Sequence, residues 1–268
     1  MGHDQRFKAV IQEFFQEFFL LFFQEWAAHM DFSSIEWLDK ELLHDPPDGA
    51  KHELDLVAKV NIFDEQGSEK TITLLVNIEF ESGTDTTSIK ERIPYYSLFL
   101  HRKFGYPVLP VVVYQRVGLN EDACIRKIRN FELFRFNYLY VGLPALDGVK
   151  YIEGESYLGN SLASLMKLPQ EDIPRLAAEI YRKLVTSPLS DRQQFLLQEF
   201  ADACLELSDA QEAELQKILS TEQFKVVQMV KKTTHEKGIE EGIEIGRTAG
   251  RSEGIEIGRE VGIEIGRE

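Results

Sequence analysis

The chain has 268 residues, of which 45 are acidic and 30 are basic, so its formal net charge is −15 at pH 7. Hydrophobic residues make up 43% of it and include 18 Phe, 9 Tyr and 2 Trp, a content that excludes a disordered polyanion. The length allows one large domain or two small ones, each with a proper core. Taken as a sum, the charge argues against an electrostatic nucleic-acid binder, which usually carries an excess of Lys and Arg.

The charge is distributed unevenly along the chain. Residues 61–85 hold 6 acidic side chains and 1 basic one, whereas residues 86–150 hold 5 acidic and 10 basic ones. A basic stretch therefore follows directly after the most acidic one. The partners that suit this chain depend on that distribution more than on the total charge.

The two cysteines, Cys124 and Cys204, lie far apart in the sequence and show no spacing typical of a zinc site or a disulfide scaffold. This favours a reducing compartment. No signal peptide is expected, because Asp4 precedes any apolar run, and we expect a cytoplasmic protein. We also expect no membrane association, since the longest uncharged run of the Phe-rich N-terminus, Phe18–Gln24, is far shorter than the roughly 20 apolar residues of a membrane span.

The first 30 residues predict one amphipathic helix. Its apolar residues recur at steps of three and four, the periodicity of a buried helical face. They are Phe7, Val10, Ile11, Phe14, Phe15, Phe18, Leu21, Phe22 and Trp26. Paired prolines and a glycine at 44–50 then predict a break in the chain.

Residues 53–63 and 71–81 each alternate between apolar and polar side chains, with the apolar ones at even positions. This alternation predicts two strands, each with one face on the core. Residues 64–70 between them have the composition of a turn, so the two strands are expected to form an antiparallel hairpin.

The predicted hairpin gathers carboxylates at one end. If its turn centres on Gly67, Asp55 faces Glu79 and Glu53 faces Glu81, with about 4.5–5.5 Å between opposed Cβ atoms. A shift of two residues would preserve the alternation and change these partners.

The later part of the chain predicts an α/β fold with a mixed sheet flanked by helices. Its expected elements, in chain order, are a helix at 88–105 with Pro94 near its first turns, strands at 106–116 and 131–143, and two to four helices between 169 and 232.

Glycine recurs every four residues from Gly238 to Gly266. Because a helix has 3.6 residues per turn, this glycine stripe would drift about 40° per repeat. Glycine also costs up to about 1 kcal/mol per position in a helix, so the tail alone predicts a marginal helix or disorder. Close packing between helices in a homo-oligomer could offset that cost.

Clustered carboxylates repel one another, so either some are protonated or a cation neutralises them. Mg²⁺ suits such oxygens and supports phosphodiester hydrolysis. A solvated acidic hairpin end remains the alternative interpretation. The following helix favours a Mg²⁺ site over a solvated hairpin end, because it carries basic residues able to meet phosphates. They are Lys90, Arg92, Arg102 and Lys103.

Asp55, the hairpin and then Glu79-Phe80-Glu81 at the end of an apolar strand resemble the PD-(D/E)XK nuclease core. In that core an Asp on one strand and an acid-x-Lys on the next hold Mg²⁺. More specifically, the chain resembles the Rpn family of recombination-promoting nucleases, also called YhgA-like transposases. The resemblance covers roughly residues 3–145 and the glycine-repeat tail. It is carried by HDQRFKAV, ELDLVAKV, LLVNIEFES and IKERIPYYSLFLHRKFGYPVLPVVVY, in that order.

By this resemblance Asp55 and Glu79 are metal ligands. Glu81 occupies the catalytic position where the wider superfamily has Lys and this family usually has Gln. At this position Glu81 is either a third metal ligand or a general base, or it indicates a weakened or lost activity. Lys59, on the same face as Asp55, is a candidate substitute for the missing lysine.

Arg92 and Tyr95 match an Arg and a Tyr found on the helix after the hairpin, and together with Lys90 they are candidate phosphate contacts. For Tyr95, packing of the helix is an equally good alternative role. Asp4 matches an Asp at the start of the first helix, where N-capping is the simpler role.

The resemblance implies a DNA endonuclease that uses Mg²⁺ or Mn²⁺ and acts in recombination or on mobile elements. The alternative is a catalytically weakened nuclease fold that binds DNA or oligomerises. We expect a nuclease-like core at 1–160, a helical appendage at 161–235 and a tail at 236–268. DNA and further copies of the chain, joined through the tail, are the expected partners.

Overall fold

The computed structural model describes residues 3–38, 54–63, 71–84, 86–118, 123–225 and 227. The predictions for Glu53, for the breaks at 44–50 and 64–70 and for the tail at 236–268 fall outside these residues. Residues up to Leu215 form one compact unit, and those from Gln216 onward belong to a second. Except for the end of α9 (Asp209–Leu219) and the 3-10 turn at Glu222–Phe224, the elements described below belong to the first unit.

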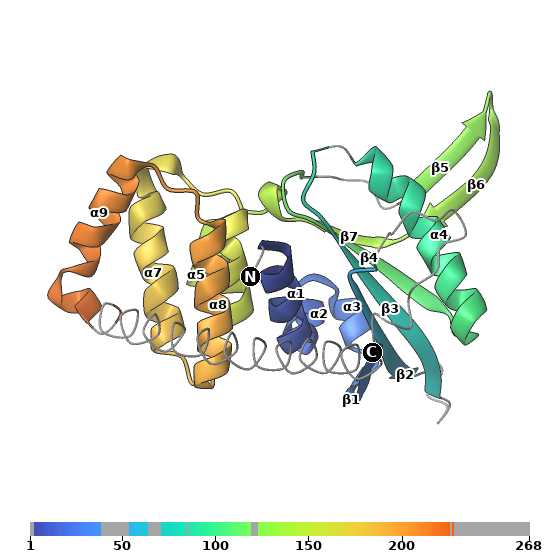
Figure 1. The fold of residues 1–268 in the computed structure, drawn as a ribbon, viewed down its shortest axis with the longest axis horizontal. Coiled ribbons are helices and arrows are strands. Elements are labelled where there is room, and N and C mark those ends of the chain that lie inside the picture. Colours follow the sequence, from blue (N-terminus) through green and yellow to red (C-terminus); the bar gives the residue numbers. More distant parts are fainter. Residues whose placement is uncertain are drawn as a thin grey trace, which may run out of the picture. The chain divides into compact units, whose positions relative to one another are not determined.

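Five strands form one mixed sheet in the order β1-β2-β3-β4-β7 (Figure 1). The β1–β2 and β2–β3 pairs are antiparallel, whereas the β3–β4 and β4–β7 pairs are parallel. The predicted α/β fold with a mixed sheet flanked by helices is therefore confirmed. The strands are β1 (Met30–Trp37), β2 (Leu56–Phe63), β3 (Thr71–Glu81), β4 (Val108–Tyr114) and β7 (Leu139–Gly142).

The β2–β3 hairpin has the register predicted from the sequence. Leu56 lies opposite Ile78 and Phe63 opposite Thr71, as expected for a turn centred on Gly67. Alternation fixes which face each side chain occupies, and the short connection limits how far one strand can slide along the other.

The prediction that only one face of this hairpin is buried is wrong. On the even-numbered face, Phe80 contacts Phe7 of the first helix, with 4.7 Å between ring centroids. On the odd-numbered face, Leu75 is buried together with Tyr96 and Leu100 of α4 (Thr87–Phe104). The parallel β3–β4 pair requires a crossover, and its helix covers the second face.

The prediction of one helix over the first 30 residues is also wrong. The segment forms three helices, α1 (His3–Glu13), α2 (Phe15–Phe22) and α3 (Gln24–Ala27), followed directly by β1. The backbone leaves helical geometry at Phe14, with φ −111° and ψ 35°, and at Phe23, with φ −138° and ψ 54°. Both interruptions keep the aromatic side chains on the core, so the periodicity survives them.

The helix after the hairpin is confirmed as α4. It ends at Gly105, whose φ of 75° is a left-handed conformation that glycine adopts at little cost. Pro94 lies inside the helix, about two turns from its start and within one residue of its predicted place in the helix.

The predicted strand at 106–116 is confirmed as β4, but the single strand at 131–143 is wrong. That segment divides at Tyr138: β7 joins the main sheet, and the part before it pairs with a strand that the sequence did not reveal. The two form a separate antiparallel sheet, β5 (Ala123–Ile128) with β6 (Phe131–Asn137).

The C-terminal half is helical, and between 169 and 225 it holds three α-helices, within the two to four predicted. The ring of Phe200 in α8 lies 5.0 Å from that of Phe7, so this region shares its core with α1. The helices are α5 (Gly148–Glu153), α6 (Tyr157–Leu162), α7 (Ile173–Val185), α8 (Asp191–Cys204) and α9 (Asp209–Leu219), with 3-10 turns at Leu143–Ala145, Ala163–Leu165, Gln170–Asp172 and Glu222–Phe224.

Cys124 and Cys204 are both buried, and neither is joined in a disulfide. No helix within the described ranges combines the length and apolar character needed to cross a membrane.

Candidate functional site

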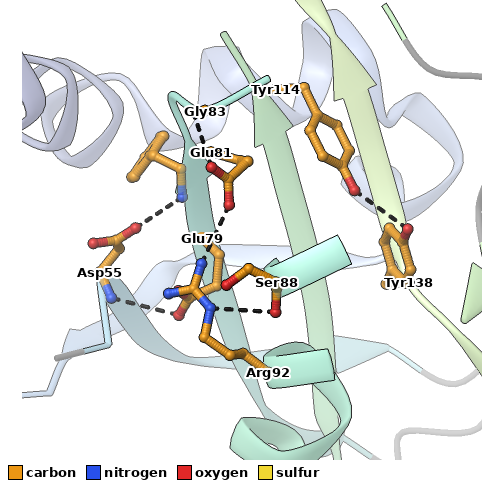
Figure 2. A network of polar contacts seen from close by, with 9 residues as sticks. Asp55, Glu79, Glu81, Gly83, Ser88, Arg92, Tyr114 and Tyr138 are labelled. Carbon is orange, nitrogen blue, oxygen red and sulfur yellow. Dashed lines mark hydrogen bonds and ion pairs between the residues drawn. The ribbon is translucent and has the colours of Figure 1, made fainter. Parts of the chain in front are cut away.

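Asp55 lies directly before β2, at the end of the hairpin where the sequence placed the carboxylates. Its Oδ2 accepts a hydrogen bond of 2.8 Å from the backbone N–H of Phe80 in β3. Its own backbone N–H points toward Glu79 Oε1 at 3.5 Å (Figure 2). The carboxylate thus continues the pairing of the two strands, which fixes it beside Glu79.

Glu79 is the buried member of this pair, with only 2% of its surface exposed. Burial, followed by the negative charge of Asp55, raises the pKa of Glu79 from 4.5 to about 8. The Asp55 backbone, Arg92 and Asn77 oppose this rise without cancelling it. Glu79 is therefore held mostly protonated at neutral pH when no further cation is present.

Lys8 of α1 completes the environment of Asp55. Its Nζ lies 2.5 Å from Asp55 Oδ1, and the two side chains are 15% and 13% exposed. Sequence reasoning missed this residue, because Lys8 and Asp55 are joined only through the packing of α1 on the sheet. As one polar residue of the Phe-rich N-terminal segment, Lys8 gave no signal of its own.

The contacts of Glu81 are with groups other than Asp55 and Glu79. Its Oε1 accepts a hydrogen bond of 2.9 Å from the Gly83 backbone, and its Oε2 lies 3.2 Å from Arg92 Nη2 (Figure 2). Arg92 is held in turn by the Ser88 carbonyl, 3.4 Å from Nε. Helix α4 therefore brings Arg92 to the end of β3, as the sequence suggested, but onto Glu81.

The charges of this cluster nearly cancel. Asp55 is paired with Lys8 and Glu81 with Arg92, so the buried Glu79 is the carboxylate without an ion pair of its own. If Glu79 ionises, the cluster gains one negative charge that a cation would have to balance.

The other residues suggested by the sequence lie on α4 or on the far part of the hairpin. Lys90 is half-buried on α4, and Tyr95 is 36% exposed there with its ring 6.1 Å from that of Tyr96. Lys59 does not substitute for the missing lysine, because its Nζ is bound 2.9 Å from Glu36 of β1. Asp4 lies within the first turn of α1.

The predicted convergence of three or four carboxylates is only partly seen. Asp55 and Glu79 lie together, whereas Glu81 is engaged by Arg92 and the Gly83 backbone. Across the part of the chain that the structure describes, no group of three or more His, Cys, Asp and Glu side chains is arranged to hold a metal ion.

Two adjacent carboxylates nevertheless offer a chemistry of their own. Carboxylate oxygens are the ligands that Mg²⁺ prefers, and Mg²⁺ usually takes only one or two of them and keeps several waters. The pair of Asp55 and Glu79 therefore fits this ion without a third protein carboxylate. The raised pKa of Glu79 reflects the same need for positive charge.

No protein-family model, curated protein or solved structure matches this chain.

Proposed function

We propose that the protein is a metal-dependent DNA endonuclease with a PD-(D/E)XK-like core, of the kind found in the Rpn family. The observation that carries this proposal is the adjacent pair of Asp55 and buried Glu79, just before β2 and near the end of β3, with Lys8 and Arg92 beside it. A mixed sheet with one helix between parallel strands supports the same proposal.

In this proposal Asp55 and Glu79 hold Mg²⁺ or Mn²⁺. Such an ion polarises a phosphoryl oxygen and lowers the pKa of a bound water, which is what phosphodiester hydrolysis requires. Lys8 and the Phe80 backbone N–H keep the Asp55 carboxylate in a fixed orientation. Burial of Glu79 strengthens electrostatic interactions at the site, because the surroundings of its side chain exclude water.

Phosphate binding is assigned in the same proposal to Lys90, Arg92 and Tyr95 of α4. The guanidinium of Arg92 is 32% exposed while it pairs with Glu81, so it retains donors for a phosphate oxygen. A duplex laid along this helix would meet positive charge beside the carboxylate pair.

Cleavage of supercoiled plasmid tests the proposal. We expect nicking with Mg²⁺ or Mn²⁺ and none with EDTA. Asp55→Asn and Glu79→Gln are expected to slow it by more than about 100-fold, the upper end of what loss of a supporting residue around a metal costs. Glu36→Gln is the matched control, because it makes the same chemical change at an exposed ion pair on β1. Unchanged nicking by both site variants would refute the site.

A second function is favoured by the contacts of Glu81. Its carboxylate is neutralised by Arg92 where the wider superfamily has a lysine, which suits a nuclease fold that binds DNA or oligomerises without cutting. In that case the wild type does not nick DNA with either metal ion. Nicking by Glu81→Lys but not by the wild type would establish this alternative, and nicking by the wild type would exclude it.

Assembly through the tail belongs to the same proposal. Deleting residues 236–268 is expected to lower the mass measured by light scattering if the tail joins copies of the chain. An unchanged mass would show that the tail is not the main oligomerisation element.

A further inference from the structure

The β5–β6 hairpin forms a sheet of its own beside α4, and Figure 1 shows it running past that helix to its tip. Its base is packed: Cys124 is buried, and Phe136 packs on the core cluster that includes Ile89 and Ile93 of α4. Its outer part is uncovered. Four large apolar side chains are exposed there, namely Ile128 (62%), Phe131 (69%), Leu133 (51%) and Phe134 (45%).

The same hairpin is basic within an acidic chain. Residues 123–137 hold four basic side chains and one acidic one, against a net charge of −15 for the whole protein. Arg126 pairs with Glu91 of α4 at 2.8 Å. Lys127 and Arg129 make no ion pair with any residue that the structure describes, so both cations near the tip are available to a partner.

The backbone of the hairpin gives the tip a particular shape. The register shifts between Arg126 and Lys127, which leaves Leu133 of β6 without an opposite residue. Such a bulge increases the local twist and redirects the side chains beyond it.

The turn itself places Arg129 at φ 54°, a left-handed conformation that costs a residue other than glycine about 1 kcal/mol or more. Glycine or asparagine would turn the chain more cheaply. The turn thus carries a cation at the tip, at a position where glycine would be less strained.

We propose that the β5–β6 hairpin is an arm that binds duplex DNA, with Lys127 and Arg129 on the phosphates and the apolar tip in the groove. This inference rests on the proposed function for its choice of nucleic acid. A two-stranded antiparallel ribbon fits the major groove of B-DNA, about 12 Å wide. In the major groove, apolar side chains also contact the methyl groups of thymine.

The charge of the hairpin and its contact with α4 both favour duplex DNA as the partner. Exposed apolar groups flanked by unpaired cations suit a polyanion that also offers apolar base and sugar surface. Neighbouring residues of α4 hold the arm and the carboxylate cluster: Glu91 binds Arg126, and Arg92 binds Glu81. One duplex bound along α4 can therefore reach both.

Fluorescence anisotropy with a labelled 30-base-pair duplex in EDTA tests the arm. Removing the two phosphate contacts with Lys127→Gln/Arg129→Gln is expected to weaken binding roughly tenfold or more and to lower the slope of log K against log salt by about 1.8. Phe131→Ser is expected to weaken binding with an unchanged slope, because it removes an uncharged contact.

The matched control is Lys150→Gln/Arg175→Gln, which makes the same charge change at exposed positions of α5 and α7. It is expected to bind like the wild type. Urea unfolding of each variant checks its stability, and the exposed hairpin substitutions are expected to leave it within about 0.5 kcal/mol of the wild type.

Equal affinity and slope for the wild type and both hairpin variants would overturn the proposal. A change in mass by light scattering with unchanged DNA affinity would also overturn it, in favour of a second copy of the chain as the partner. Plasmid nicking separates this inference from the proposed function. Hairpin-dependent binding without nicking contradicts only the nuclease, whereas nicking unaffected by the hairpin variants at every DNA concentration contradicts only the arm.

Discussion

Replacing Glu79 by Gln is expected to change how the stability of the metal-free protein depends on pH. The folded protein holds the pKa of Glu79 at about 8, above its ordinary value of 4.5, because the side chain is buried beside Asp55. Folding thus favours the protonated form. The stability that this form contributes is fully present below about pH 4.5 and is lost as the pH rises to about 8.

The magnitude follows from linkage. Each pH unit between 4.5 and about 8 costs the wild type about 1.4 kcal/mol of unfolding free energy, or roughly 5 kcal/mol over the whole interval. Gln has the same shape and does not ionise, so Glu79→Gln lacks this loss. The Gln amide shifts the unfolding free energy by an amount that does not depend on pH. The slope of the unfolding free energy against pH is therefore the informative quantity.

Urea unfolding in EDTA at several pH values from 5 to 9 measures this slope. The difference in unfolding free energy, Glu79→Gln minus wild type, is expected to rise steadily with pH and to level off above about pH 8. Glu36→Gln, at an exposed ion pair, is expected to run parallel to the wild type. Parallel profiles for Glu79→Gln and the wild type would refute the argument that Glu79 is buried without its own cation.

Three further substitutions test contacts within the helical region and between it and the sheet, and urea unfolding measures each. Phe7→Ala removes a ring shared by the sheet and the helical region, and is expected to cost about 3–5 kcal/mol; a loss below about 1 kcal/mol would contradict that shared core. Ser190→Ala removes the side-chain cap of α8 and is expected to cost about 1 kcal/mol, whereas no change would show that the cap is dispensable. Tyr181→Phe removes the hydrogen bond to Asp202 and is expected to cost about 1.5–3 kcal/mol; an unchanged midpoint would contradict that bond.

The sequence predicted the central hairpin well because local rules determine it. Alternation set which residues of β2 and β3 share a face, and a turn near Gly67 set the register that pairs Leu56 with Ile78. Helix α4 could be predicted equally well, since Gly105 marks its end. These signals lie within a few residues of the elements they define.

Features fixed by contacts between distant segments were missed. Four polar residues of β1 hide its alternation, and pairing with β2 is what makes it a strand. Lys8 meets Asp55 only after α1 packs on the sheet, and Glu81 is turned toward Arg92 by α4. No local pattern encodes these contacts. The carboxylate pair and Arg92 could therefore be predicted, but Lys8 and the pairing of Arg92 with Glu81 could not.

Titration calorimetry with Mn²⁺ or Mg²⁺ at pH 7 tests most directly whether Asp55 and Glu79 form a metal site. Because Glu79 is mostly protonated at this pH, binding is expected to release close to one proton, so the measured heat should differ between buffers of different ionisation enthalpy. The account predicts one saturable site in the wild type and in Glu36→Gln, and none in Asp55→Asn. Absence of binding to the wild type, or equal binding to Asp55→Asn, would contradict it.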